Sequence, residues 1–259
     1  MEATMPTLSD ADIKEKMTAN ELIRGGDPSH VGPACYELSM GAIYYDLTES
    51  DGQIDARTSG YILIKPGHRV VLITEEELRI PNDIIARVSS KGSLFSIGLS
   101  PVSTYADPGF TGNLGIVTQN LSDKYIQIPI GEFIAKVDFS LLTKASENPY
   151  QGQHGFQTQI WPIKHQLQKT YEEVKNDPRV KTEQEEAYKI LPQATANALR
   201  QLQRKQRIID VSILVALAIS TAVLAALSSK YIDLITAIVT NLISSAIVGA
   251  LMWFSRLKD

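Results

Sequence analysis

The sequence predicts a mainly β domain that is followed by a helical stalk and a two-helix transmembrane hairpin. Three observations support this prediction. Short β-rich runs separated by turn residues fill the region from about residue 35 to residue 142, which is typical of an all-β sandwich or barrel. Helical periodicity replaces these runs after Pro162. Two long apolar stretches then occupy most of residues 211–254.

Local signals predict the first elements of the β domain. Thr18-Ala-Asn-Glu21 has the capping-box spacing that starts a helix, and Ser9-Asp-Ala-Asp12 is a weaker form of the same signal. The runs that predict strands are residues 61–64, 69–73 and 125–130. In the last run Ile126, Ile128 and Ile130 alternate with other residues, as expected for a half-buried strand.

The region after the β domain is rich in Gln, Glu, Lys and Ala, which predicts a helical stalk. Asp177-Pro178 predicts a helix start within it, and residues 194–209 lead directly into the first apolar stretch. We therefore expect a β domain over residues 1–165, a stalk over 166–209 and a hairpin over 210–259.

The two apolar stretches, residues 211–227 and 232–254, predict membrane spans. As helices they would measure about 26 and 34 Å, close to the bilayer core of about 30 Å. A soluble helical hairpin buried in an oligomer is the alternative. The basic residues that flank the two stretches are Arg200, Arg204, Lys205, Arg207, Arg256 and Lys258. This bias predicts a multi-pass protein of the inner (plasma) membrane with both termini cytoplasmic, and the polar residues 1–20 do not predict a signal sequence.

Composition and missing motifs exclude several functions. The net charge of −4 argues against a nucleic-acid partner. The chain has one cysteine, Cys35, and no His-x-Glu or Pro-Cys-x-x-Cys pattern, so we expect no zinc site of the deaminase type. A Walker-type loop and a Gly-x-Ser-x-Gly elbow are also absent from the sequence.

Five motifs in the right order give the β region a resemblance to the dCTP deaminase and dUTPase superfamily, over roughly residues 8–160. The motifs are Val31-Gly-Pro-Ala-Cys-Tyr-Glu-Leu-Ser-Met-Gly41, Ile64-Lys-Pro-Gly67, Ser90-Lys-Gly-Ser-Leu-Phe-Ser-Ile-Gly-Leu99, Asp107-Pro-Gly-Phe-Thr-Gly112 and Tyr150-Gln-Gly-Gln-His-Gly155. The resemblance implies a distorted β-barrel of the dUTPase/dCTP deaminase type. It also implies a homotrimer with nucleotide sites between subunits.

The resemblance also implies the residues of a nucleotide site. They are Lys91, Gly92, Ser93, Asp107, Phe110, Tyr150 and Gln153. Lys91 is a flexible cation suited to a triphosphate with its Mg²⁺, and Asp107 could accept a hydrogen bond from deoxyribose and orient a water. Simpler alternatives remain open: a solvated loop lysine, a plain β-turn at Asp107 and a core aromatic at Phe110.

Departures from the family motifs predict that deamination is lost. Counted from Asp107, the position of the deaminase's essential glutamate is Val117, which can neither shuttle a proton nor activate water. Lys91 replaces the motif arginine, so bidentate phosphate contact is lost. The other replacements are Gly92 for a serine, Glu37 for the first-motif aspartate and Pro149 for a lysine.

Three functions remain open at this point. The first is a nucleotide-binding membrane protein that acts as a sensor or effector, which by analogy of architecture suggests a bacterial stress or antiviral role. The second is an enzyme, a dUTPase-like diphosphatase that uses Asp107 and Mg²⁺, or a dCTP deaminase of pyrimidine deoxynucleotide metabolism. The third is a structural trimer with a vestigial pocket. In the second apolar stretch, Asp233 and Asn241 are costly unless they face a partner or water. Asp233 could simply lie at the level of the headgroups, whereas Asn241 is near mid-span, so we expect Asn241 above all to matter to an effector.

Overall fold

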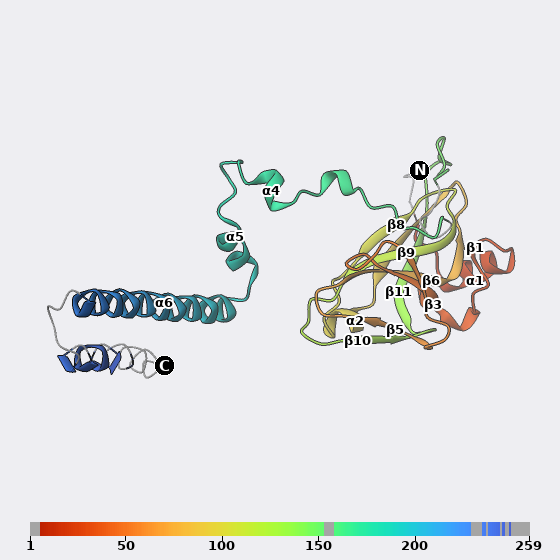
Figure 1. Ribbon diagram of the computed structural model, residues 1–259. Coiled ribbons are helices and arrows are strands. Elements are labelled where there is room, and N and C mark those ends of the chain that lie inside the picture. Colours follow the sequence, from red (N-terminus) through yellow and green to blue (C-terminus); the bar gives the residue numbers. More distant parts are fainter. Residues whose placement is uncertain are drawn as a thin grey trace. The chain divides into compact units, whose positions relative to one another are not determined.

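The computed structural model describes residues 6–152 and 158–228, and then residues 235–236, 238–243, 245–246 and 249. The chain divides into two compact units, Met1–His165 and Gln166–Asp259 (Figure 1). The predicted boundary between β domain and stalk remains a proposal, and each unit is described separately below.

The first unit is mainly β. Its strands are β1 (Leu22–Arg24), β2 (Val31–Gly32), β3 (Cys35–Asp46), β4 (Gln53–Asp55), β5 (Tyr61–Ile64), β6 (Arg69–Arg79), β7 (Ile84–Ser90), β8 (Ser103–Ala106), β9 (Thr111–Gln119), β10 (Ile126–Pro129) and β11 (Phe133–Leu141). Its helices are α1 (Asp10–Thr18), η1 (Pro28–His30), α2 (Gly92–Ser96) and η2 (His165–Leu167), the last of which crosses the boundary between the units.

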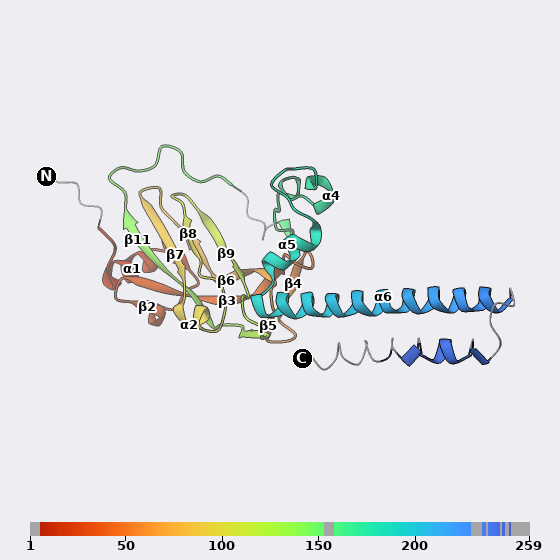
Figure 2. The ribbon, with the colours of Figure 1, turned by 90° about the vertical axis from the view of Figure 1, so that its left-hand side faces the viewer.

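The strands form one large curled sheet, open along one side, and a separate two-stranded sheet (Figures 1 and 2). The order in the large sheet is β1-β6-β3-β11-β7-β8, with β9 on β6 and with β2 and β4 on β3. The small sheet pairs β5 with β10 in antiparallel register. The expectation of a mainly β fold with a barrel-like sheet is therefore confirmed, while the two-helix hairpin remains a proposal.

The side chains enclosed by the curled sheet form one continuous hydrophobic core. Tyr36, Phe139 and Met40 are fully buried there, together with Ile62 and Ile64 of the small sheet. A smaller cluster of Ile43, Tyr45, Val71 and Ile73 lies on the opposite face of β3 and β6. Because neighbouring residues of a strand point to opposite faces, both faces of β6 are covered by apolar side chains.

The three predicted strands and one of the two predicted helix starts in this unit are confirmed, and the other helix start is wrong. β5, β6 and β10 form where the β-rich runs predict them, with Ile126 and Ile128 buried and Ile130 just beyond the end of β10. The helix near the N-terminus begins after Ser9, whose hydroxyl accepts from Asp12 N, and it ends at Thr18. The prediction of a helix start at Thr18 is therefore wrong, because Asn20 takes a left-handed conformation (φ 59°) and the chain continues into β1.

The second unit consists of short helices and one long one. These are α4 (Tyr171–Val174), α5 (Glu183–Ile190) and α6 (Gln193–Ser228). The helix start predicted at Asp177-Pro178 is wrong: Asp177 accepts from Arg179 N in a turn, and α5 begins instead at a capping box formed by Thr182 and Glu185.

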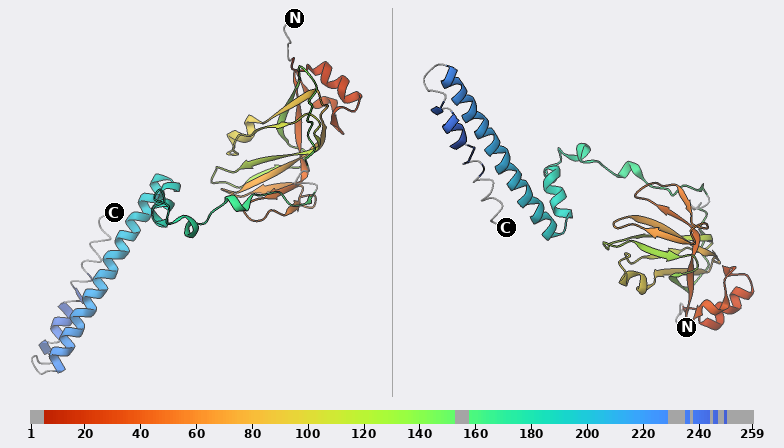
Figure 3. Two further views of the ribbon diagram at one scale, coloured as in Figure 1. Left: turned by 90° about the horizontal axis from the view of Figure 1, so that it is seen from above. Right: turned by 60° about the horizontal axis from the view of Figure 1, so that its bottom comes forward.

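One helix of the described residues, Gln193–Ala226, is long and apolar enough to cross a membrane, with a mean hydropathy of 2.4 in its most apolar window. It crosses the predicted boundary between stalk and first span without a break. The described residues between 235 and 249 are helical and run beside α6 (Figures 1–3). Asp233 and about half of the predicted second span lie outside the described residues.

Candidate functional site

The motif that contains Lys91, Gly92 and Ser93, the predicted phosphate contacts, lies where β7 ends and α2 begins. Lys91 is the residue between the two elements, and its backbone N–H donates to Ile134 O at 3.1 Å. Gly92 and Ser93 are exposed, and a Cβ added to Gly92 would meet no atom within 4 Å. The surface beside this segment is therefore open to a ligand.

The ammonium group of Lys91 is held by a carboxylate and an aromatic ring. Lys91 Nζ lies 3.0 Å from Glu37 Oε1 and 5.0 Å from the centre of the Phe133 ring. Lys136 Nζ lies 3.6 Å from the same Glu37 oxygen, so two cations share one carboxylate. The hydrogen bond from Lys91 is the main cause that lowers the pKa of Glu37 below its ordinary value of 4.5. This cluster carries a local surplus of positive charge, which suits an anion.

The Asp107 motif forms a tight turn that the segment before Tyr150 crosses. Phe110 N donates to Asp107 O at 2.9 Å, and Tyr150 N donates to Pro108 O at 2.7 Å. Gly109 has φ 85°, and a Cβ there would stand 2.8 Å from Pro149 Cβ, so the crossing requires glycine. The Asp107 side chain itself is exposed to solvent.

Phe110 points into the core rather than to the surface. It is 5% exposed, and its ring centre lies 5.6 Å from that of the half-buried Tyr150. This placement fits the alternative that Phe110 is a core aromatic. The predicted contact of Phe110 with a nucleotide remains a prediction. Gln153 lies outside the described residues.

One chain does not bring these two halves of the predicted site together. β7 and β8 pair in antiparallel register, with Ser89 opposite Ser103 and Ala86 opposite Ala106 (Figure 2). Lys91 therefore follows one end of the pair and Asp107 follows the other. In this register Asp107 falls opposite Ile85, and Lys91 lies six residues further along the chain, or about 20 Å away.

The position of the deaminase glutamate, Val117, lies on β9 and faces away from the core. Val117 is 43% exposed, whereas Ile116 and Thr118 on either side of it are buried. The residues that share its face are Asn113, Gly115 and Gln119, all within the described part of β9. This face of β9 therefore holds no carboxylate that could take the role of the glutamate.

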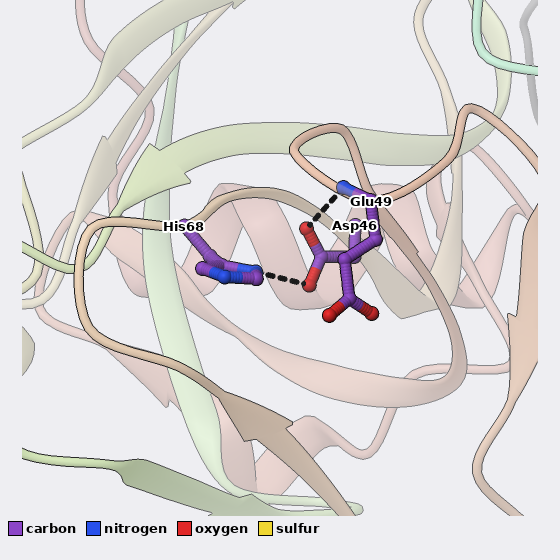
Figure 4. Close-up of side chains that lie close together, drawn as sticks. All are labelled: Asp46, Glu49 and His68. Carbon is purple, nitrogen blue, oxygen red and sulfur yellow. Dashed lines mark hydrogen bonds and ion pairs between the residues drawn. The ribbon is translucent and has the colours of Figure 1, made fainter.

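A group of Asp46, Glu49 and His68 has the composition of a metal site (Figure 4). Its hydrogen bonds describe a structural role instead. Asp46 accepts from His68 Nδ1 at 2.8 Å and from Thr48 N at 3.0 Å, and Glu49 forms an ion pair with Lys65. Lys65 already supplies a positive charge beside Glu49. These contacts hold the turn after β3 closed, and no metal ion is needed to explain why the three side chains lie together.

Sequence reasoning missed the residues that cover the smaller apolar cluster. Trp161 packs against the cluster, 5.8 Å from Tyr45 between ring centres, and a Cβ on Gly115 would stand 2.7 Å from Trp161 Cζ3. A hollow of about 460 Å³ opens beside Ile43 and Ile73 of the same cluster. A tryptophan in a polar stretch is the one signal that could have indicated the contact.

Comparison with known protein families matches the first unit to one family. The model of the dCTP deaminase-like family matches residues 7–142, more than half of the chain. The chain therefore belongs to the dCTP deaminase-like family.

Individual relatives match the same region. A dCTP deaminase of Thermococcus kodakarensis is 29% identical over 140 residues, which are 54% of this chain and 88% of the relative. A dUMP-forming dCTP deaminase of Methanosphaera stadtmanae is 26% identical over 168 residues, covering 56% of this chain and 84% of the relative.

Two solved structures give weaker likenesses. The dCTP deaminase of Agrobacterium tumefaciens has a TM-score of 0.46 and 17% identity, covering 53% of this chain and 48% of that one. A mutant dUTPase from phage phi11 of S. aureus, described with a structural Mg(II) ion, has a TM-score of 0.36 and 15% identity, covering 50% of this chain and 91% of that one.

The ion pair at Glu37 predicts a pH-dependent contribution to stability. Because the folded-state pKa is lowered, this contribution is full above the unfolded value of 4.5 and is lost as pH falls through the folded-state pKa. We expect Glu37→Gln to lower the free energy of unfolding by about 1 kcal/mol at pH 7 and by much less near about pH 3. Urea denaturation at both pH values measures the effect.

The matched control is Glu132→Gln, at an exposed position of the turn that joins β10 to β11. Its effect should be small and the same at both pH values. A loss at Glu37 that does not depend on pH would contradict the assignment of the ion pair.

Proposed function

We propose that this chain is a membrane-anchored nucleotide-binding protein of the dCTP deaminase-like family that no longer deaminates and acts as a nucleotide sensor or membrane effector. The observation that carries the proposal is Val117 on the outward face of β9, in the position that the resemblance gives to the essential glutamate. An apolar side chain there removes the general acid–base group, while the surface beside Gly92 and Ser93 stays open.

The separated halves of the site support a homotrimer. Lys91 and Asp107 follow opposite ends of the β7–β8 pair, so a nucleotide that contacts both motifs has to lie between two copies of the chain. In this arrangement Lys91, Gly92 and Ser93 of one copy would hold the phosphates, and Asp107 and Tyr150 of another would hold the sugar. Mg²⁺ would accompany the triphosphate, and none of these steps uses zinc.

The alternative function is a dUTPase-like diphosphatase. It is favoured by the Asp107 carboxylate, which is exposed on the tight turn at Gly109 and forms no ion pair among the described residues. Such a carboxylate can position a water for attack on a phosphate that Mg²⁺ polarises. This reaction needs no group at Val117.

The features of α6 support the membrane anchor. Four basic residues precede its apolar part, and Asp210 is the single acid within the helix. This pattern supports a multi-pass protein of the inner membrane with the β domain and both termini in the cytoplasm. We retain residues 1–165, 166–209 and 210–259 as the β domain, the stalk and the transmembrane hairpin.

The described part of the second apolar stretch contains one polar group that supports an effector role. Asn241 Oδ1 is buried and has no donor among the described residues. An amide in a membrane is stabilised by a partner from another helix or by water, so Asn241 would bind one or the other in an assembled trimer. Such an assembly could change membrane permeability in a bacterial stress or antiviral response.

Nucleotide binding is the first test of the proposal. We expect one or more of dCTP, dUTP and dTTP with Mg²⁺ to raise the melting temperature of the purified chain by about 5–10 °C at roughly 100 times Kd. Lys91→Met should reduce this shift strongly, because it removes the cation that faces the phosphates. A chain that none of these nucleotides stabilises would contradict the proposal and favour a structural trimer.

Diphosphate release from the same nucleotides separates sensor from enzyme. The proposal expects no release above background, whereas release that Asp107→Asn abolishes would establish the diphosphatase. Asp123→Asn is the matched control, since Asp123 is an exposed aspartate in the loop between β9 and β10.

Membrane topology is tested by cysteine labelling, because Cys35 is the only native cysteine. In a Cys35→Ala background we expect Ser229→Cys to react with a membrane-impermeant maleimide on intact cells lacking the outer membrane. Lys258→Cys should react only after the membrane is opened. Equal labelling of both positions, or recovery of the chain in the soluble fraction, would contradict the hairpin.

A further inference from the structure

The segment that follows the family domain lies across the face of the sheet that carries Val117. We call residues 158–163 the strap. Gln53 N donates to Gln159 O at 3.2 Å, and Trp161 N donates to Asp51 O at 3.0 Å. These bonds hold the strap beside β4, and the Trp161 ring then reaches the apolar cluster of β3 and β6.

Trp161 occupies the surface next to the position of the missing glutamate. Its ring lies so close to Gly115 that a Cβ there would stand 2.7 Å from Trp161 Cζ3. Gly115 and Val117 share the outward face of β9, about 7 Å apart along the strand. A planar base presented to Val117 would therefore compete with the Trp161 ring for the same strip of the sheet.

The docked strap carries two unfavourable features. Gln159 has φ 60°, in the left-handed region that a residue with a side chain rarely adopts. Gln53, to whose backbone the strap is bound, keeps its Oε1 buried with no donor among the described residues. Release of the strap would relax the backbone strain at Gln159, so the docked and released states are closer in free energy than the aromatic contact alone suggests.

We propose that the strap is a displaceable cover of the nucleotide site, and that a bound base and the docked Trp161 exclude one another. This inference rests on the proposed nucleotide binding and adds its regulation. The strap ends three residues before Gln166, the first residue of the second unit. Displacement of the strap would therefore lengthen the unbound segment that precedes α6. In this way the binding of a base to the β domain would change the connection to the second unit.

The emission of Trp161 tests the exclusion directly. Trp253→Phe leaves Trp161 as the single tryptophan of the full-length chain in detergent. We expect dCTP or the non-hydrolysable dUpNHpp, with Mg²⁺, to shift this emission to the red. Without nucleotide, Gly115→Ala should already show the shifted emission, because its methyl group occupies the place of the ring.

Calorimetric titration gives the second readout. If the strap is docked in about nine-tenths of the molecules, Trp161→Ala raises the affinity for the same two nucleotides about 10-fold. Ile160→Ala is the matched control in the same strap, since Ile160 is 56% exposed and lies outside the apolar cluster, and it should change the affinity less than twofold.

The outcomes distinguish failure of the proposed cover from failure of the proposed nucleotide binding. Equal affinity of wild type and Trp161→Ala, with an emission that nucleotide does not change, overturns the cover and leaves nucleotide binding intact. Binding of neither nucleotide to either protein contradicts the proposed function, and the cover with it.

Discussion

The register of β9 on β6 is the constraint on which the functional argument depends. Val117 pairs with Val71 and Gly115 pairs with Ile73, which turns both β9 residues away from the main core. A slip of one residue would turn Val117 inward and bring Ile116 to the surface. The irregular stretch of β6 that follows Ile73 is held in place by Asn113, whose amide donates to Thr74 O at 2.9 Å and to Glu75 O at 3.0 Å. The register is thus fixed by buried apolar alternation and by a side-chain amide together.

A second register, that of β8 on β7, explains why the two halves of the predicted site stay apart in one chain. The family motifs are tied to opposite ends of the β7–β8 pair, so no local movement of a loop could join Lys91 to Asp107. Glu37 holds the ammonium of Lys91 in the absence of a phosphate. In the proposed nucleotide complex the phosphate would replace that carboxylate, so the Glu37 pair would compete with the ligand as well as stabilise the free chain.

Much of the fold could be predicted from the sequence because its signals are local. The alternation of isoleucines identified β10, and Tyr61–Ile64 was identified as a strand by composition. The weaker capping signal at Ser9 marks the true start of α1, whereas the stronger pattern at Thr18 starts no helix, because Asn20 takes a left-handed conformation just after α1 ends. The helix start predicted at Asp177-Pro178 was wrong for a similar local reason, because the Asp177 carboxylate accepts hydrogen bonds from Arg179 in a turn instead of capping a helix.

The site was only partly predictable, because its contacts join residues far apart in the sequence. Motif order predicted Lys91 and Asp107 as site residues, which stays a prediction, and it placed Val117 where a carboxylate was expected. The partnership of Lys91 with Glu37 and the contact of Trp161 with Gly115 depend on tertiary packing across more than 40 residues, which no periodicity or spacing reveals. The surface position of Asp107 and the buried position of Phe110 likewise follow from the turn at Gly109, not from the motif itself.

Ammonia release from dCTP by the full-length chain is the measurement that tests the central claim most directly. The claim is that the outward face of β9 no longer supplies the carboxylate for deamination. It predicts no release above the enzyme-free rate, with Val117→Glu as the variant that returns a carboxylate to the exposed position. Turnover by the wild-type chain at about 1 s⁻¹ or faster, as in ordinary enzymes, would contradict the claim and show that another group serves as the base.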